Sequence, residues 1–447
     1  MRIVFACSEA APWAKTGGLA DVAGSLPTAL RAQGHRVRLV LPMHRSVRQE
    51  LARRGLQPAP GPVFESSLGR GQFWRQGPNW FFDAPEFFDR EGIYGPEPGS
   101  HYGDTRYSDG LQRFALFNQA VAACLPELGG GRVDVLHIHD WQTAILARMV
   151  SVPTLLTLHN LAYQGVFSSS EAWQLGGIPF SGGEVNLLRE GIAACTAVNT
   201  VSPRYAHEVQ TPEFGEGLHG LLAERGVSGI LNGIDTQEWD PASDRYATQT
   251  FTAGDLSGKA ACARALRSDL GLSPSDGPLF GVVSRLAQMK GLDQVVQRTG
   301  DLVDAGGQLV VLGSGSPELE QDLSALASRF PSQVAVKIGF NVPLAHRIVA
   351  GVDAMLMPSR FEPCGLNQMY AMRYGALPLV TPVGGLADTV QEGVNGFVDW
   401  DLGASLERAF AAWGTPDWDR MVQAAMARDA SWGESARAYS KLYRSLV

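Results

Sequence analysis

The stretches VDVLHIHD (residues 133–140) and PTLLTLHN (residues 153–160) decide the fold class of this chain. Each is a short apolar run that ends in polar residues. Short apolar strands that alternate with helices are typical of βαβ units, in which the strands lie parallel and buried. The pattern therefore predicts an α/β protein whose strand ends carry His139, Asp140 and His159.

The same alternation extends in both directions along the chain. It includes IVFA (3–6), VRLVLP (37–42), AVNTVS (197–202) and SGILNGID (228–235), and then LFGVVS (279–284), QLVVLG (308–313), VAVKIG (334–339), DAMLMPS (353–359) and LPLVTP (377–382). Residues 236–260 are polar and aperiodic, which favours a linker. Residues 60–104 are rich in Gly, Pro and aromatics, which favours an irregular hairpin-bearing insertion. Because 447 residues exceed the usual size of one core, we expect two doubly wound α/β domains.

The composition limits the classes of partner. A net charge of −8 argues against nucleic acid, which is normally bound by basic patches. Five cysteines without a C-x-x-C spacing argue against a disulfide framework and a structural zinc site, and favour a reducing cytoplasm. The N-terminal apolar run is broken by Ser8 and Glu9, so it predicts a buried strand rather than a signal peptide. No stretch is apolar for long enough to span a bilayer, so no membrane partner is expected.

Polar motifs follow several predicted strands, and ligands of open α/β sheets bind beyond the carboxyl ends of strands. In KTGGLADV (15–22), Gly17 and Gly18 allow close backbone approach, the helix N-terminus favours negative charge, and Lys15 adds a positive one. A diphosphate or carboxylate cradle and a plain turn with a solvated lysine are equally compatible with this spacing. The strand-end histidines can bind sugar hydroxyls, and the missing third ligand argues against metal.

Two loops of the second half carry charged residues of complementary kinds. SRLAQMKGLD contains Arg285 and Lys290, which suit a diphosphate but equally suit two solvated loop positions. SRFEPCGLNQMY contains Glu362, whose carboxylate can accept hydrogen bonds from sugar hydroxyls. TPVGGLADT (381–389) repeats the GGLAD string of the N-terminal loop and predicts a second glycine-rich turn at a strand end.

Together, KTGGLADV, HDW, LHNLAYQG, NGID, SRLAQMKGLD, SRFEPCGL and TPVGGLADT resemble the glycogen and starch synthases of glycosyltransferase family 5. The resemblance implies a GT-B fold, with two Rossmann-like domains facing across a cleft. Residues 1–240 would form the acceptor side and residues 241–429 the nucleotide-sugar side, with a helix at about 430–447 packing back on the first domain. It implies retaining transfer of glucose from ADP-glucose to the non-reducing 4-hydroxyl of glycogen or another α-1,4-glucan, without a metal or cofactor.

The resemblance also implies residue roles. The catalytic residues would be His159, Arg285, Lys290 and Glu362. The donor would be bound by Lys15, Gly17, Gly18, Asp21, Asp140, Asn232, Cys364, Gly365, Leu366, Gly384 and Gly385, and the acceptor by Glu9, Tyr94, Tyr163 and Gln164. Tyr370 stands where related GT-B enzymes often have a second Glu, and Phe340 where the family suggests a tyrosine. The implied mechanism is electrostatic, with the two loop cations taking up charge on the departing diphosphate.

Three other interpretations stay open. A UDP-glucose-dependent retaining GT-B transferase would share most of these motifs. A Rossmann oxidoreductase is disfavoured because no G-x-G-x-x-G follows the first strand. A non-catalytic glucan-binding protein is disfavoured because Lys15, Arg285, Lys290 and Glu362 are all present.

Overall fold

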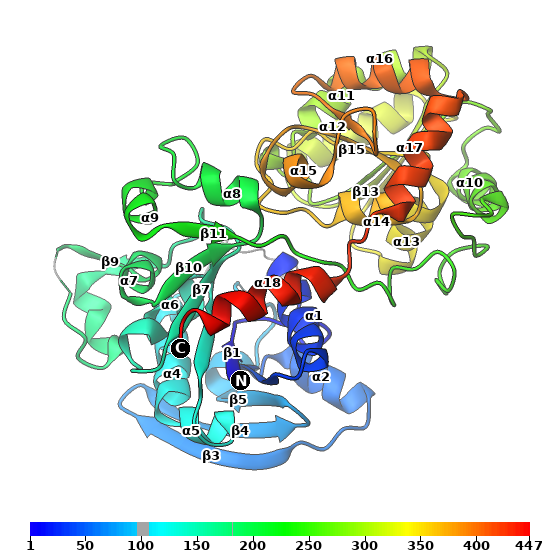
Figure 1. Ribbon diagram of the computed structural model, residues 1–447. Helices are drawn as coiled ribbons and strands as arrows, with labels where there is room; N and C mark the ends of the chain where they lie inside the picture. The colour runs from blue at the N-terminus through cyan, green and yellow to red at the C-terminus, as the bar shows by residue number, and fades with distance from the viewer. Residues whose placement is uncertain (96–106, 181) are drawn as a thin grey trace. The chain divides into compact units, whose positions relative to one another are not determined.

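The computed structural model describes residues 1–95, 107–180 and 182–447 (Figure 1). It divides into two compact units, Met1–Gly233 with Trp432–Val447, and Ile234–Ser431. The boundaries thus fall at 233/234 and 431/432, whereas the sequence analysis placed them at 240/241 and 429/430.

The first unit is built on a nine-stranded sheet in the order β11-β10-β7-β6-β1-β2-β5-β4-β3. The strands are β1 (Arg2–Ala6), β2 (Arg36–Pro42), β3 (Ala59–Ser66), β4 (Gly69–Gln76), β5 (Asn79–Asp83), β6 (Val135–His139), β7 (Thr154–Leu158), β10 (Ala197–Thr200) and β11 (Val227–Gly229). Neighbouring strands from β11 to β5 run parallel. The central strands β6 and β7 are buried along their whole length, as their apolar runs require.

The aromatic-rich interval after residue 60 contains the predicted hairpins, but its first part is a regular part of this sheet and not an irregular insertion. Strands β3, β4 and β5 form an antiparallel meander, and β5 then pairs in parallel with β2. Phe81 and Phe82 are fully buried, because a β5 that joins the main sheet has both of its faces covered. Residues 96–104 of the interval lie outside the described residues.

Helices surround the first sheet. They are α1 (Gly18–Ala32), α2 (Arg45–Arg53), α3 (Pro85–Phe88), α4 (Gly110–Ala123), α5 (Leu125–Gly129), α6 (Asp140–Ala144), η1 (Ile145–Arg148), η2 (Ser169–Leu175), α7 (Leu187–Ala194), α8 (Pro203–Glu208), α9 (His219–Arg225) and α18 (Trp432–Arg444), with the small hairpin β8 (Val166–Ser168) and β9 (Glu184–Asn186). The C-terminal helix α18 packs beside α1 (Figure 1). Its buried positions are 432, 435, 436, 439, 440 and 443, which is the spacing of one helical face.

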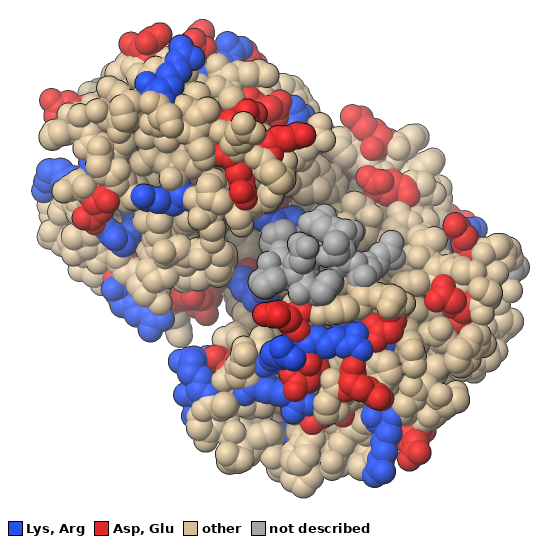
Figure 2. Space-filling view, turned by 180° about the vertical axis from the view of Figure 1, so that it is seen from behind, with Lys and Arg blue, Asp and Glu red and all other residues tan. Residues whose placement is uncertain are grey.

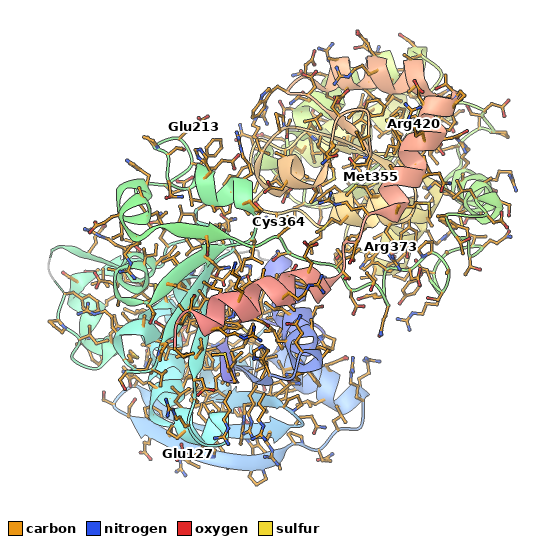
Figure 3. All side chains as sticks on the ribbon, in the orientation of Figure 1. Glu127, Glu213, Met355, Cys364, Arg373 and Arg420 are labelled. Atoms are coloured by element: carbon orange, nitrogen blue, oxygen red, sulfur yellow. The ribbon has the colours of Figure 1, made fainter. Side chains whose placement is uncertain are left out.

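The second unit is built on a six-stranded sheet that is parallel throughout, in the order β14-β13-β12-β15-β16-β17. The strands are β12 (Leu279–Val283), β13 (Gln308–Gly313), β14 (Val334–Ile338), β15 (Ala354–Met357), β16 (Leu377–Val380) and β17 (Phe397–Val398). The helices are α10 (Ser257–Leu270), η3 (Gln288–Lys290), α11 (Leu292–Asp304), α12 (Pro317–Arg329), α13 (Val342–Gly351), α14 (Asn367–Arg373), α15 (Gly384–Thr389), α16 (Leu402–Ala412) and α17 (Pro416–Ala427). Met355 of β15 lies in the core of this unit (Figure 3). The prediction of two doubly wound α/β halves is confirmed.

Residues 236–260 were predicted to be a linker, but they belong to the second unit, and residues 257–260 are already part of α10. The Trp239 ring is stacked between His346, at 3.7 Å between centroids, and Tyr370, at 3.9 Å. The Asp244 carboxylate accepts a hydrogen bond from Tyr374 (2.7 Å) and lies 2.8 Å from His346 Nδ1. This segment has no periodic pattern because its few buried side chains are held one by one against α13 and α14. Tyr370 therefore contributes its ring to this buried stack.

On the face shown in Figure 2, Lys and Arg side chains are interspersed with Asp and Glu. Among the described residues, no helix combines the length and the apolar character needed to cross a membrane.

Candidate active site

The neighbouring strands β6 and β7 bring His139 and His159 together at their carboxyl ends. His139 Nδ1 lies 3.0 Å from His159 Nε2. Asp140 adopts a positive φ of 51°, and its carboxylate accepts a hydrogen bond from the His159 amide at 2.7 Å. Burial lowers the pKa of His159 to about 3. This histidine is therefore neutral near pH 7 and can offer hydrogen bonds to hydroxyl groups, but not charge.

The buried side chain of Glu9 holds the Lys15 loop in place. Glu9 lies in the loop after β1 and is fully buried, and its Oε2 accepts hydrogen bonds from the Thr16 amide (2.5 Å) and hydroxyl (2.9 Å). Burial raises the pKa of Glu9 to about 7. Lys15 is half-exposed and pairs with Asp21 at 2.6 Å. The adjacent Gly17 and Gly18 lie where α1 begins, Gly17 as its N-cap and Gly18 as its first residue.

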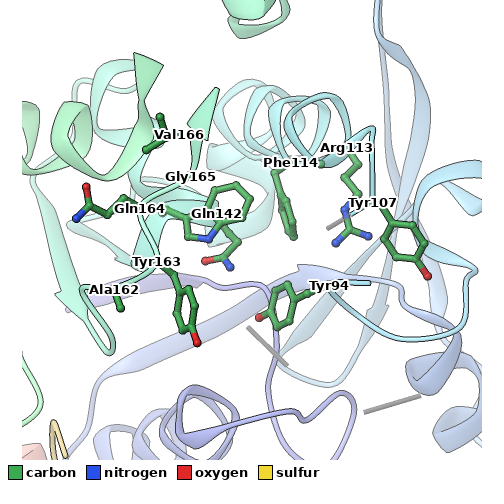
Figure 4. Close-up of a pocket in the computed structure, with 12 residues that line it drawn as sticks. Tyr94, Tyr107, Arg113, Phe114, Gln142, Ala162, Tyr163, Gln164, Gly165 and Val166 are labelled. Carbon is green, nitrogen blue, oxygen red and sulfur yellow. The ribbon is translucent and has the colours of Figure 1, made fainter. Parts of the chain in front are cut away.

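A pocket of about 290 Å³ opens in the first unit (Figure 4). It is lined by Tyr94, Tyr107, Gly110, Arg113, Phe114, Trp141, Gln142, Ala162, Tyr163, Gln164, Gly165 and Val166. The structure thus brings three of the four predicted acceptor residues into one cavity. Its size is near the lower end of the roughly 300–1,000 Å³ of small-molecule sites.

Sequence reasoning missed the pocket's inner cation, Arg113. Its guanidinium is almost fully buried and lies over the rings of Phe114 and Tyr107, at 4.7 and 5.1 Å from their centroids. Burial lowers the pKa of Arg113 to about 10, so the group stays charged at neutral pH. The signal was present in the sequence, because Arg113 is the one charged residue in the otherwise apolar and amide-bearing run LQRFALFNQAVAA.

In the second unit, Lys290 and Glu362 form a close ion pair. Lys290 Nζ lies 2.5 Å from Glu362 Oε2, with 18% and 10% of the two side chains exposed. The Ser359 hydroxyl donates to the same carboxylate oxygen at 3.3 Å. Arg285 precedes Lys290 in the loop after β12, and its Nη2 lies 4.0 Å from Met289 Sδ. The loop that carries Lys290 and the loop that carries Glu362 therefore meet at the carboxyl ends of β12 and β15.

The second glycine-rich turn fits against the loop that carries Glu362. A Cβ atom on Gly384 would lie 1.9 Å from the Glu362 carbonyl oxygen, and one on Gly385 would lie 2.1 Å from that of Cys364. The Gly385 amide donates to the carbonyls of Glu362 and Pro363, at 3.2 Å each. These glycines are required because two backbones touch here, and the Gly385 amide already has protein partners.

The remaining predicted donor residues lie at turns of the unit to which each belongs. Cys364 is buried (Figure 3), Gly365 has a positive φ of 72°, and Leu366 caps α14. Asn232 follows β11 in the first unit and is buried, and its Oδ1 has no hydrogen-bond partner among the described residues. Arg360, which the sequence analysis did not single out, binds Asp293 through two nitrogens at 2.7 and 2.6 Å.

Comparison with known proteins agrees with both halves of this arrangement. Residues 2–224 match the family model of the starch synthase catalytic domain, and residues 268–399 match glycosyl transferases group 1. The chain is 42% identical to the glycogen synthase of Anaeromyxobacter sp. (strain Fw109-5), and the alignment covers 100% of both chains. The chain belongs to the glycogen and starch synthase family. It is a glucosyltransferase of glycogen synthesis, so the resemblance drawn from the seven motifs is confirmed.

Solved structures support the same fold. The catalytic domain of Starch Synthase IV from Arabidopsis thaliana, bound to ADP and acarbose, is 34% identical with a TM-score of 0.84, over 99% of this chain and 98% of that one. Sucrose-phosphate synthase from Thermosynechococcus elongatus matches with a TM-score of 0.62 at 18% identity, over 100% and 99% of the chains, and so shows the fold alone. The predicted GT-B fold is confirmed. A glycogen synthase of this family acts on a nucleotide sugar and a glucan, which removes the oxidoreductase and non-catalytic interpretations.

Proposed function

We propose that the donor is ADP-glucose and that glucose passes, with retention of its anomeric configuration, to the 4-hydroxyl at the non-reducing end of an α-1,4-glucan. The observation that carries the proposal is the Lys290–Glu362 pair with Arg285 in the same strand-end loop. The two cations can bind a diphosphate. The carboxylate can accept hydrogen bonds from sugar hydroxyls. The ADP in the related plant starch synthase supports adenine as the base.

In this proposal the second unit stabilises the leaving group and holds the donor sugar. Arg285 and Lys290 stabilise the charge that develops on the departing diphosphate. Glu362 accepts hydrogen bonds from hydroxyls of the transferred glucose. Because Lys290 is paired with Glu362 in the free protein, a bound donor gives each of them a new partner. The backbone of residues 364–366 contacts the sugar, and Gly384 and Gly385 keep that loop in place.

The first unit would supply the remaining contacts. Lys15 with Gly17 and Gly18 binds donor phosphate, and Asp21 orients Lys15. The neutral His159, with Asp140 and Asn232, binds hydroxyls of the reacting glucose. No side chain acts as a nucleophile, and the proton of the attacking hydroxyl passes to the leaving phosphate.

We assign the glucan acceptor to the pocket of Figure 4. Aromatic rings can cover the apolar faces of glucose units, while amides and hydroxyls orient them. Tyr94, Tyr163 and Gln164 provide these groups, and Gln164 is itself held by Asn186 at 2.5 Å. Glu9 lies outside this lining and would act from the neighbouring Lys15 loop.

A cytoplasmic location is supported by five cysteines that are all free, buried thiols.

The donor base is tested by comparing ADP-glucose with UDP-glucose on a maltooligosaccharide primer. We expect kcat/KM to be higher for ADP-glucose by about tenfold or more, a ratio that contacts to one base can supply. The product should be degraded by an exo-hydrolase specific for α-1,4 linkages. Equal or faster turnover of UDP-glucose would favour the UDP-glucose-dependent alternative, and a product resistant to the hydrolase would exclude retention.

A further inference from the structure

Helix α18 inserts two fully buried tyrosines against the strands that end in the candidate catalytic histidines. Tyr439 and Tyr443 are one helical turn apart and neither is exposed. The Tyr443 hydroxyl lies 2.8 Å from His137 Nδ1 on β6. The Tyr439 hydroxyl accepts a hydrogen bond from Asn199 Nδ2 on β10, at 3.1 Å. The last helix of the chain is thus bonded to the core of the first sheet.

A chain of hydrogen bonds runs from Tyr443 to Tyr439 through three side chains of the sheet, and only one assignment of donors and acceptors fits it. The Thr157 hydroxyl on β7 donates to Asn199 Oδ1 at 2.6 Å. Since that hydroxyl has a single proton, it must accept from His137 Nε2, which lies 2.5 Å away. His137 therefore carries its proton on Nε2, its Nδ1 is an acceptor, and Tyr443 is the donor. Burial holds the pKa of His137 well below its usual range, so the ring is neutral, as this assignment requires.

His137 is in turn linked to His159. His137 and His139 are two residues apart on β6, so both project from the same face of the sheet. Their ring centroids are 4.2 Å apart, and His139 Nδ1 lies 3.0 Å from His159 Nε2. The orientation of the His137 ring therefore determines how the His139 ring packs, and through it where the His159 ring lies.

We propose that Tyr443 is a positioning residue for glucosyl transfer, acting through His137 and His139 on His159. It touches no substrate. Its hydroxyl donates to His137 Nδ1 and holds the ring in place, and without it this buried ring nitrogen has no donor among the residues that the structure describes. The inference rests on the proposed role of His159 at the reacting sugar.

Tyr443→Phe keeps the ring and removes only the hydroxyl. We expect kcat to fall about tenfold, the order expected when a buried polar group loses its partner, while KM for the donor and the glucan stays within about twofold. Ser440→Ala is the matched control on the same helix. The Ser440 hydroxyl is buried and bonded to His35 (2.9 Å) and Gln33 (2.7 Å), away from the histidine chain, so kcat should be unchanged.

Imidazole nitrogen NMR of the full-length protein supplies a second readout. His137 should show a proton on Nε2 in all three proteins, and the Nδ1 resonance should shift in Tyr443→Phe but not in Ser440→Ala, because only Tyr443→Phe removes the hydrogen bond to Nδ1. A proton on Nδ1 in the wild type would overturn the proposal even if Tyr443→Phe did not fold. Wild-type kcat in Tyr443→Phe, or an equal loss in both variants, would overturn it too. A wild-type protein that transfers no glucose would instead refute the proposed function.

Discussion

Lys290 and Glu362 occupy a site in which neither charge could stay unpaired at low cost. Their 2.5 Å separation and small exposed fractions mean that each neutralises the other in the free protein. Removing one partner of such a pair leaves an uncompensated, largely buried charge. In the proposed function, these two groups are the ones that meet the diphosphate and the hydroxyls of the donor.

Lys290→Ala should lower kcat by about 10²–10³, the loss typical of removing one group that stabilises transition-state charge. Initial rates with ADP-glucose and glycogen measure this effect. Arg420→Ala is the matched control, because Arg420 is two-thirds exposed and, among the described residues, its ion pair is with Asp417 of its own helix. Near-normal turnover of Lys290→Ala would refute the assignment, and thermal unfolding of both variants separates lost catalysis from lost folding.

At the scale of elements, the turn from Val383 into α15 acts as a support for the loop that carries Glu362. The repeated GGLAD string was predicted to form a phosphate-binding turn, because the N-terminal loop contains the same string. In the structure its glycines also permit direct backbone contact with residues 362–364, which the sequence could not reveal because the contact joins segments twenty residues apart.

Gly385→Ala should therefore displace this loop. A Cβ atom 2.1 Å from the Cys364 carbonyl oxygen must push the backbone aside. We therefore expect the free energy of unfolding to fall by about 1–3 kcal/mol, and kcat to fall as well because the loop that carries Glu362 moves. Gly300→Ala, in the middle of α11 with open space around the added atom, should be neutral or stabilising by about 0.5–1 kcal/mol. Denaturant unfolding and initial rates compare the two. Equal behaviour of both variants would contradict the role of Gly385.

The strand-end motifs could be predicted from sequence because buried parallel strands appear as short apolar runs, and their polar ends are then placed at one edge of the sheet. The Lys290–Glu362 pair follows from that placement. Trp239 and Asp244 were not predictable, because isolated residues that dock on α13 and α14 leave no periodic signal. The same is true of Tyr443, whose contact with His137 spans 306 positions of the chain.

For the molecule as a whole, four buried neutral histidines place an acid-sensitive element in the first unit. Burial lowers the pKa of His44 and His159 to about 3 and holds the pKa of His137 and His139 well below the usual range. In the unfolded chain these groups take up a proton below about pH 6.5. The raised pKa values of Glu9 and Asp83 act in the opposite direction, since the folded state then binds those protons more tightly. These two carboxyls oppose the four imidazoles and that of His35, whose pKa burial also lowers.

The first unit should therefore lose stability as the pH falls below about 6.5, by about 1.4 kcal/mol per pH unit for each histidine. Hydrogen exchange is read by mass spectrometry at pH 7 and at pH 5.5, and the rates are corrected for the pH dependence of intrinsic amide exchange. The corrected rates should show faster opening of β6 and β7 at the lower pH. A His44→Gln variant, which lacks one of the four groups, should show a weaker dependence. Protection of β6 and β7 that does not change with pH would contradict this account.

The central claim is that this protein extends a glucan from ADP-glucose. Full-length protein is incubated with ADP-glucose labelled in its glucose and with glycogen, and the label is followed into polymer that precipitates with alcohol. The account predicts label in the polymer, increasing with protein and abolished by Lys290→Ala. ADP-glucose that stays intact, or label that is released only as free glucose, would contradict it.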